Sequence, residues 1–137
     1  MSIVSLGIEV LDVEHREIVD LNLALFNAIN GRGPAVDSFD VMVRLYRLAK
    51  THFKSEEDLF VGWDGAAYHT NLHNDMVRQL NRIFIKFDVQ SADYDKSRQM
   101  EHLTELSNFV SSWFNNHIAY EDTKYIPFLR GKLAVSA

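Results

Sequence analysis

The sequence predicts an all-α protein, an antiparallel up-down-up-down four-helix bundle with a short C-terminal helical segment. Apolar side chains recur at spacings of three and four in four long segments, and three short polar or glycine-rich breaks separate them. Strand-type alternation is not evident in the sequence. The length of 137 residues suits a single domain over 1–137. Short connections between long helices favour antiparallel neighbours.

Each helix has a sequence signal for its beginning or end. Asp12 is expected to cap the first helix, and the Gly-Arg-Gly-Pro run at 31–34 ends it. The Gly-Trp-Asp-Gly run at 62–65 separates the second helix from the third, and Pro127 marks a separate final segment. The four helices are expected at about 12–30, 38–61, 66–87 and 94–120, and the short C-terminal segment at about 122–130.

Composition excludes several classes of function. The sequence has no cysteine, which removes disulfides and thiolate metal sites and fits a cytoplasmic location. The formal net charge is −5 and no basic cluster occurs, so a nucleic-acid partner is not expected. The N-terminus lacks a secretory signal pattern, and no apolar run is long enough to span a membrane, so no membrane partner is expected.

The six histidines carry the functional signal. His52 and Glu56 lie four residues apart in the second helix, and so do His69 and His73 in the third. Helical positions i and i+4 share one face, so such pairs can reach one metal ion or two adjacent ones. Each pattern alone is also typical of a hydrogen-bonded core histidine or a solvated surface pair. The first helix adds His15, and the fourth adds His117 followed by Glu121 and Asp122.

The antiparallel topology brings these residues together. The start of the first helix, the end of the second, the start of the third and the end of the fourth lie at one level of the bundle. All but one of the six histidines fall in that layer. The exception is His102, which lies about 22 Å from His117 along the helix and is expected to be an ordinary surface or loop-end residue.

This donor set favours two metal ions. Five imidazoles with one or two carboxylates exceed the needs of one tetrahedral zinc ion, whereas two octahedral ions bridged by carboxylates can use them all. The Glu-x-x-His motifs of ferritin-like di-iron proteins are absent. Spacing alone selects Glu121 as the partner of His117, because Asp122 is turned by about 140° from His117 on a regular helix.

The motifs, in this order, resemble those of the hemerythrins, particularly the bacterial ones. The resemblance runs from about Gly7 to Leu129 and includes the His-Phe-x-x-Glu-Glu run at 52–57 and the Trp-x-x-x-His-Ile run at 113–118. Two positions depart from the pattern of many bacterial members: Leu6 replaces an aromatic residue, and Trp63-Asp64 replaces Tyr-Pro.

The resemblance implies a specific centre. One non-haem iron ion would be held by His69, His73 and His117, and the other by His15 and His52. Glu56 and Asp122 would bridge the two ions beside an oxo or hydroxo group, which requires a π-type bulge or a helix end before Asp122. The family binds dioxygen reversibly and is not expected to act as an enzyme.

An apolar pocket for dioxygen has five candidate residues, for each of which ordinary core packing is the other reading: Leu11, Ile18, Val19, Trp113 and Phe114. Storage, delivery or scavenging of dioxygen is the leading function. An oxygen- or redox-sensing module with a signalling output domain or partner is the main alternative. A di-iron peroxidase, a nitric-oxide-reacting enzyme and a plain zinc or structural bundle are less favoured.

Overall fold

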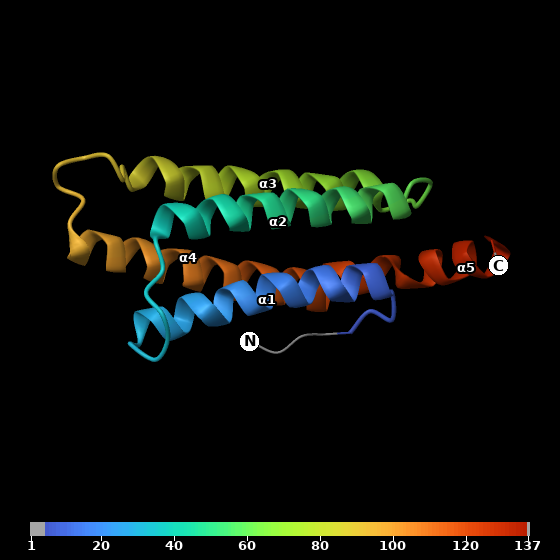
Figure 1. Ribbon diagram of the computed structural model, residues 1–137. Coiled ribbons are helices and arrows are strands. Elements are labelled where there is room, and N and C mark those ends of the chain that lie inside the picture. The colour runs from blue at the N-terminus through green and yellow to red at the C-terminus, as the bar shows by residue number, and fades with distance from the viewer. Residues whose placement is uncertain (1–4, 137) are drawn as a thin grey trace.

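The computed structural model describes residues 5–136, with side chains described as far as residue 132. These residues form a helical bundle without strands (Figure 1), which confirms the predicted fold class. The bundle helices are α1 (Glu9–Ile29), α2 (Ser38–Leu59), α3 (Ala66–Lys86) and α4 (Lys96–Asn116). A π-helical turn η1 (His117–Glu121), a 3₁₀ turn η2 (Asp122–Tyr125) and helix α5 (Ile126–Ser136) follow.

Successive bundle helices run in opposite directions (Figure 1). Helix α1 packs against α2 and α4, and α3 also packs against both. The beginnings of α1 and α3 therefore meet the ends of α2 and α4 at one end of the bundle, and α5 extends outward from this end (Figure 1). This is the layer in which the sequence placed all but one of its histidines.

Apolar side chains from all four bundle helices form the core. Leu25, Leu45, Leu80 and Leu106, one from each bundle helix, are each at most 1% exposed. Burial of each such side chain stabilises the folded protein by about 1.5–3 kcal/mol relative to leaving it exposed. No helix in the described part of the chain combines the length and the apolar character needed to cross a membrane.

The first helix begins earlier than predicted. Asp12 does not cap α1, which starts at Glu9 with Ile8 at the cap position. The Asp12 carboxylate instead accepts hydrogen bonds from the backbone N–H groups of Leu6 and Gly7, at 2.8 and 3.1 Å. Gly7 turns the chain with a φ of 75°, a conformation that glycine adopts without steric penalty. Asp12 therefore fastens the preceding segment to the first turns of the helix.

The C-terminal helical segment is also longer than expected, because α5 continues to Ser136. Pro127 does not stop it. As the second residue of α5, Pro127 lies in the first turn, where a missing N–H removes no helical hydrogen bond.

The prediction of a surface or loop-end position for His102 is wrong, because its side chain is fully buried. Its ring stacks on Phe87 with centroids 4.5 Å apart, and a 2.9 Å hydrogen bond joins Nδ1 to the hydroxyl of Tyr94. That hydroxyl also hydrogen-bonds to Ser38. His102 precedes Leu106 by four residues and therefore shares its core-facing side of α4.

Candidate metal centre

Seven side chains converge at the end of the bundle where α1 begins. They come from α1, α2, α3 and the two turns after α4, and each is at most 5% exposed: His15, His52, Glu56, His69, His73, His117 and Asp122. These are the seven metal-ligand candidates that the sequence and the family resemblance selected. The structure brings all seven together.

Helical spacing positions the pairs on α2 and α3. His52 and Glu56 are four residues apart, and His52 Nε2 is in direct contact with Glu56 Oε1. His69 and His73 are likewise four apart on α3, with ring centroids separated by 4.7 Å. Each pair therefore points from one helix face into the same buried layer.

A π-helical turn places Asp122 beside His117. The backbone N–H of Asp122 donates to the carbonyl of His117, five residues earlier. This wider turn brings Asp122 Oδ1 within 2.8 Å of His117 Nε2. Glu121, the residue favoured by regular spacing, points elsewhere and pairs with Lys124 at 3.1 Å.

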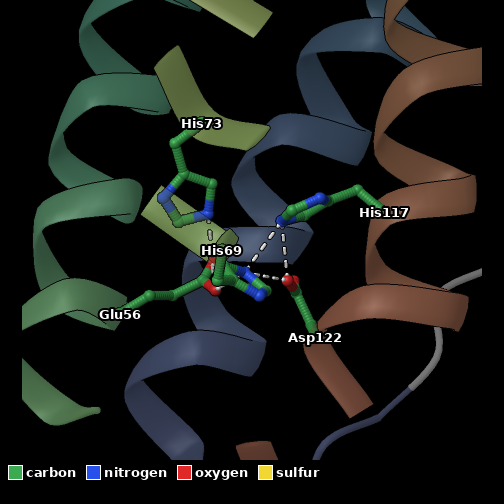
Figure 2. Close-up of side chains that lie close together, drawn as sticks. All are labelled: Glu56, His69, His73, His117 and Asp122. Carbon is green, nitrogen blue, oxygen red and sulfur yellow. Dashed lines mark hydrogen bonds and ion pairs between the residues drawn. The ribbon is translucent and has the colours of Figure 1, made fainter. Parts of the chain in front are cut away.

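The side chains form two overlapping groups. Within each group, the ligand atoms lie within 4.8 Å of one another. The larger group contains Glu56, His69, His73, His117 and Asp122, which Figure 2 shows. The smaller group contains His15, His52, Glu56 and Asp122. Both carboxylates are therefore shared, whereas each histidine belongs to one group.

The two oxygens of each carboxylate face different groups. Glu56 directs Oε1 toward His52 and Oε2 toward Nε2 of His69, at 3.3 Å. Asp122 directs Oδ1 toward His69, at 2.9 Å, and Oδ2 toward Nε2 of His15, at 3.3 Å. This division is the arrangement that two carboxylates need to bridge a pair of cations.

The donor atoms fit metal ions better than they fit one another. Both oxygens of Glu56 and of Asp122 are buried and lack a hydrogen-bond partner of suitable geometry among the described residues. The same holds for Nε2 of His15, His52 and His73. Burying so many unsatisfied polar atoms is costly. Because all are nitrogen or carboxylate-oxygen donors, they suit divalent transition metals.

Electrostatics within the cluster favour a bound cation. Burial lowers the pKa of His52, but the carboxylates of Glu56, Glu14 and Asp122 together outweigh this effect and bring the pKa to about 10. Burial acts in the same way on His69, and Asp122 and Glu56 together raise its pKa to about 9. Burial dominates at His73 and lowers its pKa to about 3. The carboxylates thus favour protonation of the neighbouring imidazoles. Metal ions would compete with these protons for the same nitrogen atoms.

Comparison with known families agrees with this geometry. The sequence model of the hemerythrin HHE cation-binding domain matches residues 6–129, which is most of the chain. The chain belongs to the hemerythrin family.

Several curated proteins named bacteriohemerythrin are similar to this chain. One from Clostridium acetobutylicum is 27% identical over 127 residues, covering 88% of this chain and 92% of its own length. One from Pseudomonas aeruginosa is 26% identical, covering 93% of this chain and 78% of its own. One from Campylobacter jejuni is 23% identical, covering 95% and 93%. No solved structure gave a significant match.

Aromatic rings surround the centre of this hemerythrin. Phe53 stacks on His73 with centroids 3.9 Å apart, and Trp113 stacks on His117 at 4.3 Å. Phe60 meets His69 edge to face at 5.3 Å. These rings cover histidine faces with apolar surface, which fixes ring orientation and lowers the local polarity.

The five pocket candidates are not equally placed. Leu11, Ile18 and Phe114 are at most 1% exposed, whereas Val19 and Trp113 are partly exposed. Phe114 reaches the centre through Phe53, with ring centroids 6.1 Å apart. Leu11, Ile18 and Phe114 therefore belong to the buried apolar core.

Three residues at the site were missed by sequence reasoning. Glu14 and Glu57 each lie beside a ligand candidate in the sequence and contact a histidine from another helix, which spacing within one helix does not reveal. Tyr125 is fully buried 5.4 Å from His69, and burial with the nearby carboxylates raises the pKa of its phenol. Its position three residues after Asp122 is the available sequence signal.

Proposed function

We propose that this hemerythrin holds two non-haem iron ions in its buried cluster and binds dioxygen reversibly, for storage, delivery or scavenging in the cytoplasm. The observation that carries the proposal is the division of Glu56 and Asp122, each with one oxygen toward each histidine group. His69, His73 and His117 would hold one ion, and His15 and His52 the other.

The unequal groups give the two metal positions different tasks. The larger group supplies three imidazoles and two carboxylate oxygens, and the smaller supplies two imidazoles and two carboxylate oxygens. The smaller group therefore leaves more room for a solvent-derived bridge and a small ligand. Ferrous ions bound there would supply the electrons that dioxygen binding requires. The protein residues hold the two positions at fixed separation and exclude bulk water.

The balance of neutral and anionic ligands favours reversible binding. Five imidazoles and only two carboxylates would place less negative charge around the two ions than carboxylate-rich di-iron sites do. Less anionic charge stabilises the high-valent states used in oxygenase chemistry less well. Apolar neighbours such as Phe53 and Phe114 also limit entry of water and anions.

Anaerobic reconstitution tests this function. The metal-free protein is loaded with ferrous iron without oxygen, exposed to air, and then flushed with argon while visible absorption is recorded. We expect a charge-transfer band that appears with air and disappears under argon over repeated cycles. Zinc-loaded protein is the control and should show no band. Immediate and permanent conversion to the ferric spectrum would contradict reversible binding.

An oxygen- or redox-sensing role is the second candidate. Asp122 begins η2, which leads within one turn into α5, so a ligand candidate is directly joined to a helix that extends from the bundle (Figure 1). Sensing predicts a ligand-dependent change in α5, measured as altered amide hydrogen exchange between the iron-loaded forms with and without dioxygen. Identical exchange in α5 would oppose it.

A further inference from the structure

We infer that Glu14 is a positioning residue for the metal pair, which orients His52 and adds negative charge to the smaller ligand group. The inference rests on the proposed metal-binding function. Glu14 lies on α1 and is not one of the clustered ligand candidates. Its side chain is 16% exposed, so it lies at the boundary of the buried layer.

Both carboxylate oxygens of Glu14 are engaged across the α1–α2 interface. Oε1 lies 3.2 Å from Nδ1 of His52, and Oε2 accepts a 2.9 Å hydrogen bond from the hydroxyl of Ser55. Because His52 and Ser55 both belong to α2, these two contacts fix the Glu14 carboxylate of α1 relative to α2. The hydrogen bond from Ser55 therefore holds the Glu14 carboxylate in the position where it faces His52.

The contact with Glu14 determines which nitrogen of His52 faces the centre. A carboxylate beside Nδ1 favours the tautomer in which Nδ1 carries the proton and donates it to the hydrogen bond. Nε2 then presents its lone pair toward the buried layer, where it meets Glu56. Partners of this kind orient metal-binding histidines and increase their basicity.

The corresponding contact at the larger group is weaker. Glu57 Oε2 lies 3.4 Å from Nδ1 of His73, and the Glu57 side chain is 32% exposed. Greater exposure screens its charge more strongly. The two carboxylates thus hold their histidines unequally. The stronger contact, from Glu14 to His52, belongs to the ligand group with fewer protein ligands. Glu14 should affect the metal position proposed to bind dioxygen more than Glu57 affects its neighbour.

Substitutions can separate the hydrogen bond from the charge. Glu14→Gln keeps an oxygen that can accept from His52 but removes the negative charge, whereas Glu14→Leu removes both. Glu57→Gln makes the same change at the larger group. Glu17→Gln is the matched control, because Glu17 is an exposed residue of the same helix and loses the same charge.

Cobalt(II) binding tests the inference without any oxygen chemistry. Affinity is measured by competition with a chelator, together with the visible spectrum of bound cobalt. We expect Glu14→Leu to weaken binding at one of two cobalt positions by about 10- to 100-fold. Glu14→Gln should lose less cobalt affinity than Glu14→Leu, and Glu57→Gln should lose less still. Glu17→Gln should lose none. In iron-loaded protein, Glu14→Gln should also raise the midpoint potential.

The results distinguish this inference from the proposed function. If the unmodified protein binds two cobalt ions but both Glu14 variants match it in affinity and spectrum, the role of Glu14 is overturned while the metal centre stands. If the unmodified protein binds no metal, the proposed function itself fails. Circular dichroism of the metal-free variants checks folding. Should Glu14→Leu not fold, Glu14→Gln against Glu17→Gln decides the outcome.

Discussion

Asp122 Oδ1 lies 2.8 Å from His117 Nε2, although Asp122 is five positions after His117 and a regular α-helix would turn the two side chains about 140° apart. The π-helical turn η1 resolves this conflict by adding a residue to the turn. π-helical turns are frequent at functional sites. This turn allows a carboxylate to face both histidine groups, whereas the partly exposed Glu121 pairs with Lys124.

The first prediction separates these adjacent acidic residues. Asp122→Asn removes the negative charge of a carboxylate shared by both groups and replaces one of its two oxygens with an amide nitrogen, so we expect metal content to fall well below that of the unmodified protein. Glu121→Gln removes the same charge one residue away and should keep the full content. Metal analysis of both variants after identical loading checks this. Equal metal content in the two variants would contradict the assignment.

A second prediction concerns the pH dependence of the metal-free protein. The pKa values of His52 and His69 are raised from 6.5 to about 10 and about 9 by neighbouring carboxylates, against the opposing effect of burial. Their contribution to stability is therefore complete below about pH 6.5 and is lost as pH rises through 9 to 10. We expect the unfolding temperature of metal-free protein to fall across this range.

Metal loading should remove that dependence, because bound cations replace the protons on these imidazoles. Thermal unfolding followed by circular dichroism, with and without metal, gives the comparison. A metal-free unfolding temperature that stays constant or rises from pH 7 to pH 10 would show that His52 and His69 are not protonated in the empty cluster.

A third prediction concerns the hydrogen-bonded group at the opposite end of the bundle. Tyr94→Phe removes the bonds from the Tyr94 hydroxyl to His102 and Ser38. We expect a loss of about 1–3 kcal/mol in the free energy of unfolding, because His102 Nδ1 is then buried without a partner. Metal content should not change.

Tyr120→Phe serves as the control, because Tyr120 is 68% exposed and its change should stay within about 0.5 kcal/mol. Urea denaturation of both variants measures the difference. A Tyr94 variant as stable as the Tyr120 variant would show that the buried hydrogen bonds contribute nothing net.

Much of the centre could be predicted from local spacing. His52 with Glu56 and His69 with His73 follow the i, i+4 rule, and antiparallel topology alone brings their helices to one layer. That layer also receives His15, from the start of α1. These features depend on regular helix geometry, which the apolar period in the sequence indicates directly.

The remaining features depend on departures from regular geometry or on contacts between helices. Periodicity does not predict a π turn, so spacing favoured Glu121 over Asp122. Asp12 resembles a cap because its carboxylate does bind backbone N–H groups, but they belong to the segment before the helix. Distance from the cluster does not place His102 at the surface, because His102 lies four residues before Leu106 on the core-facing side of α4.

The central claim, two ions that bind dioxygen reversibly, is tested most directly by stoichiometry on one sample. Ferrous protein prepared without oxygen is analysed for iron, equilibrated with dioxygen, and then purged while uptake and release of gas are measured. We predict two iron ions and one dioxygen molecule per chain, with the dioxygen recovered on purging. One iron ion per chain, or dioxygen consumed without recovery, would contradict this account.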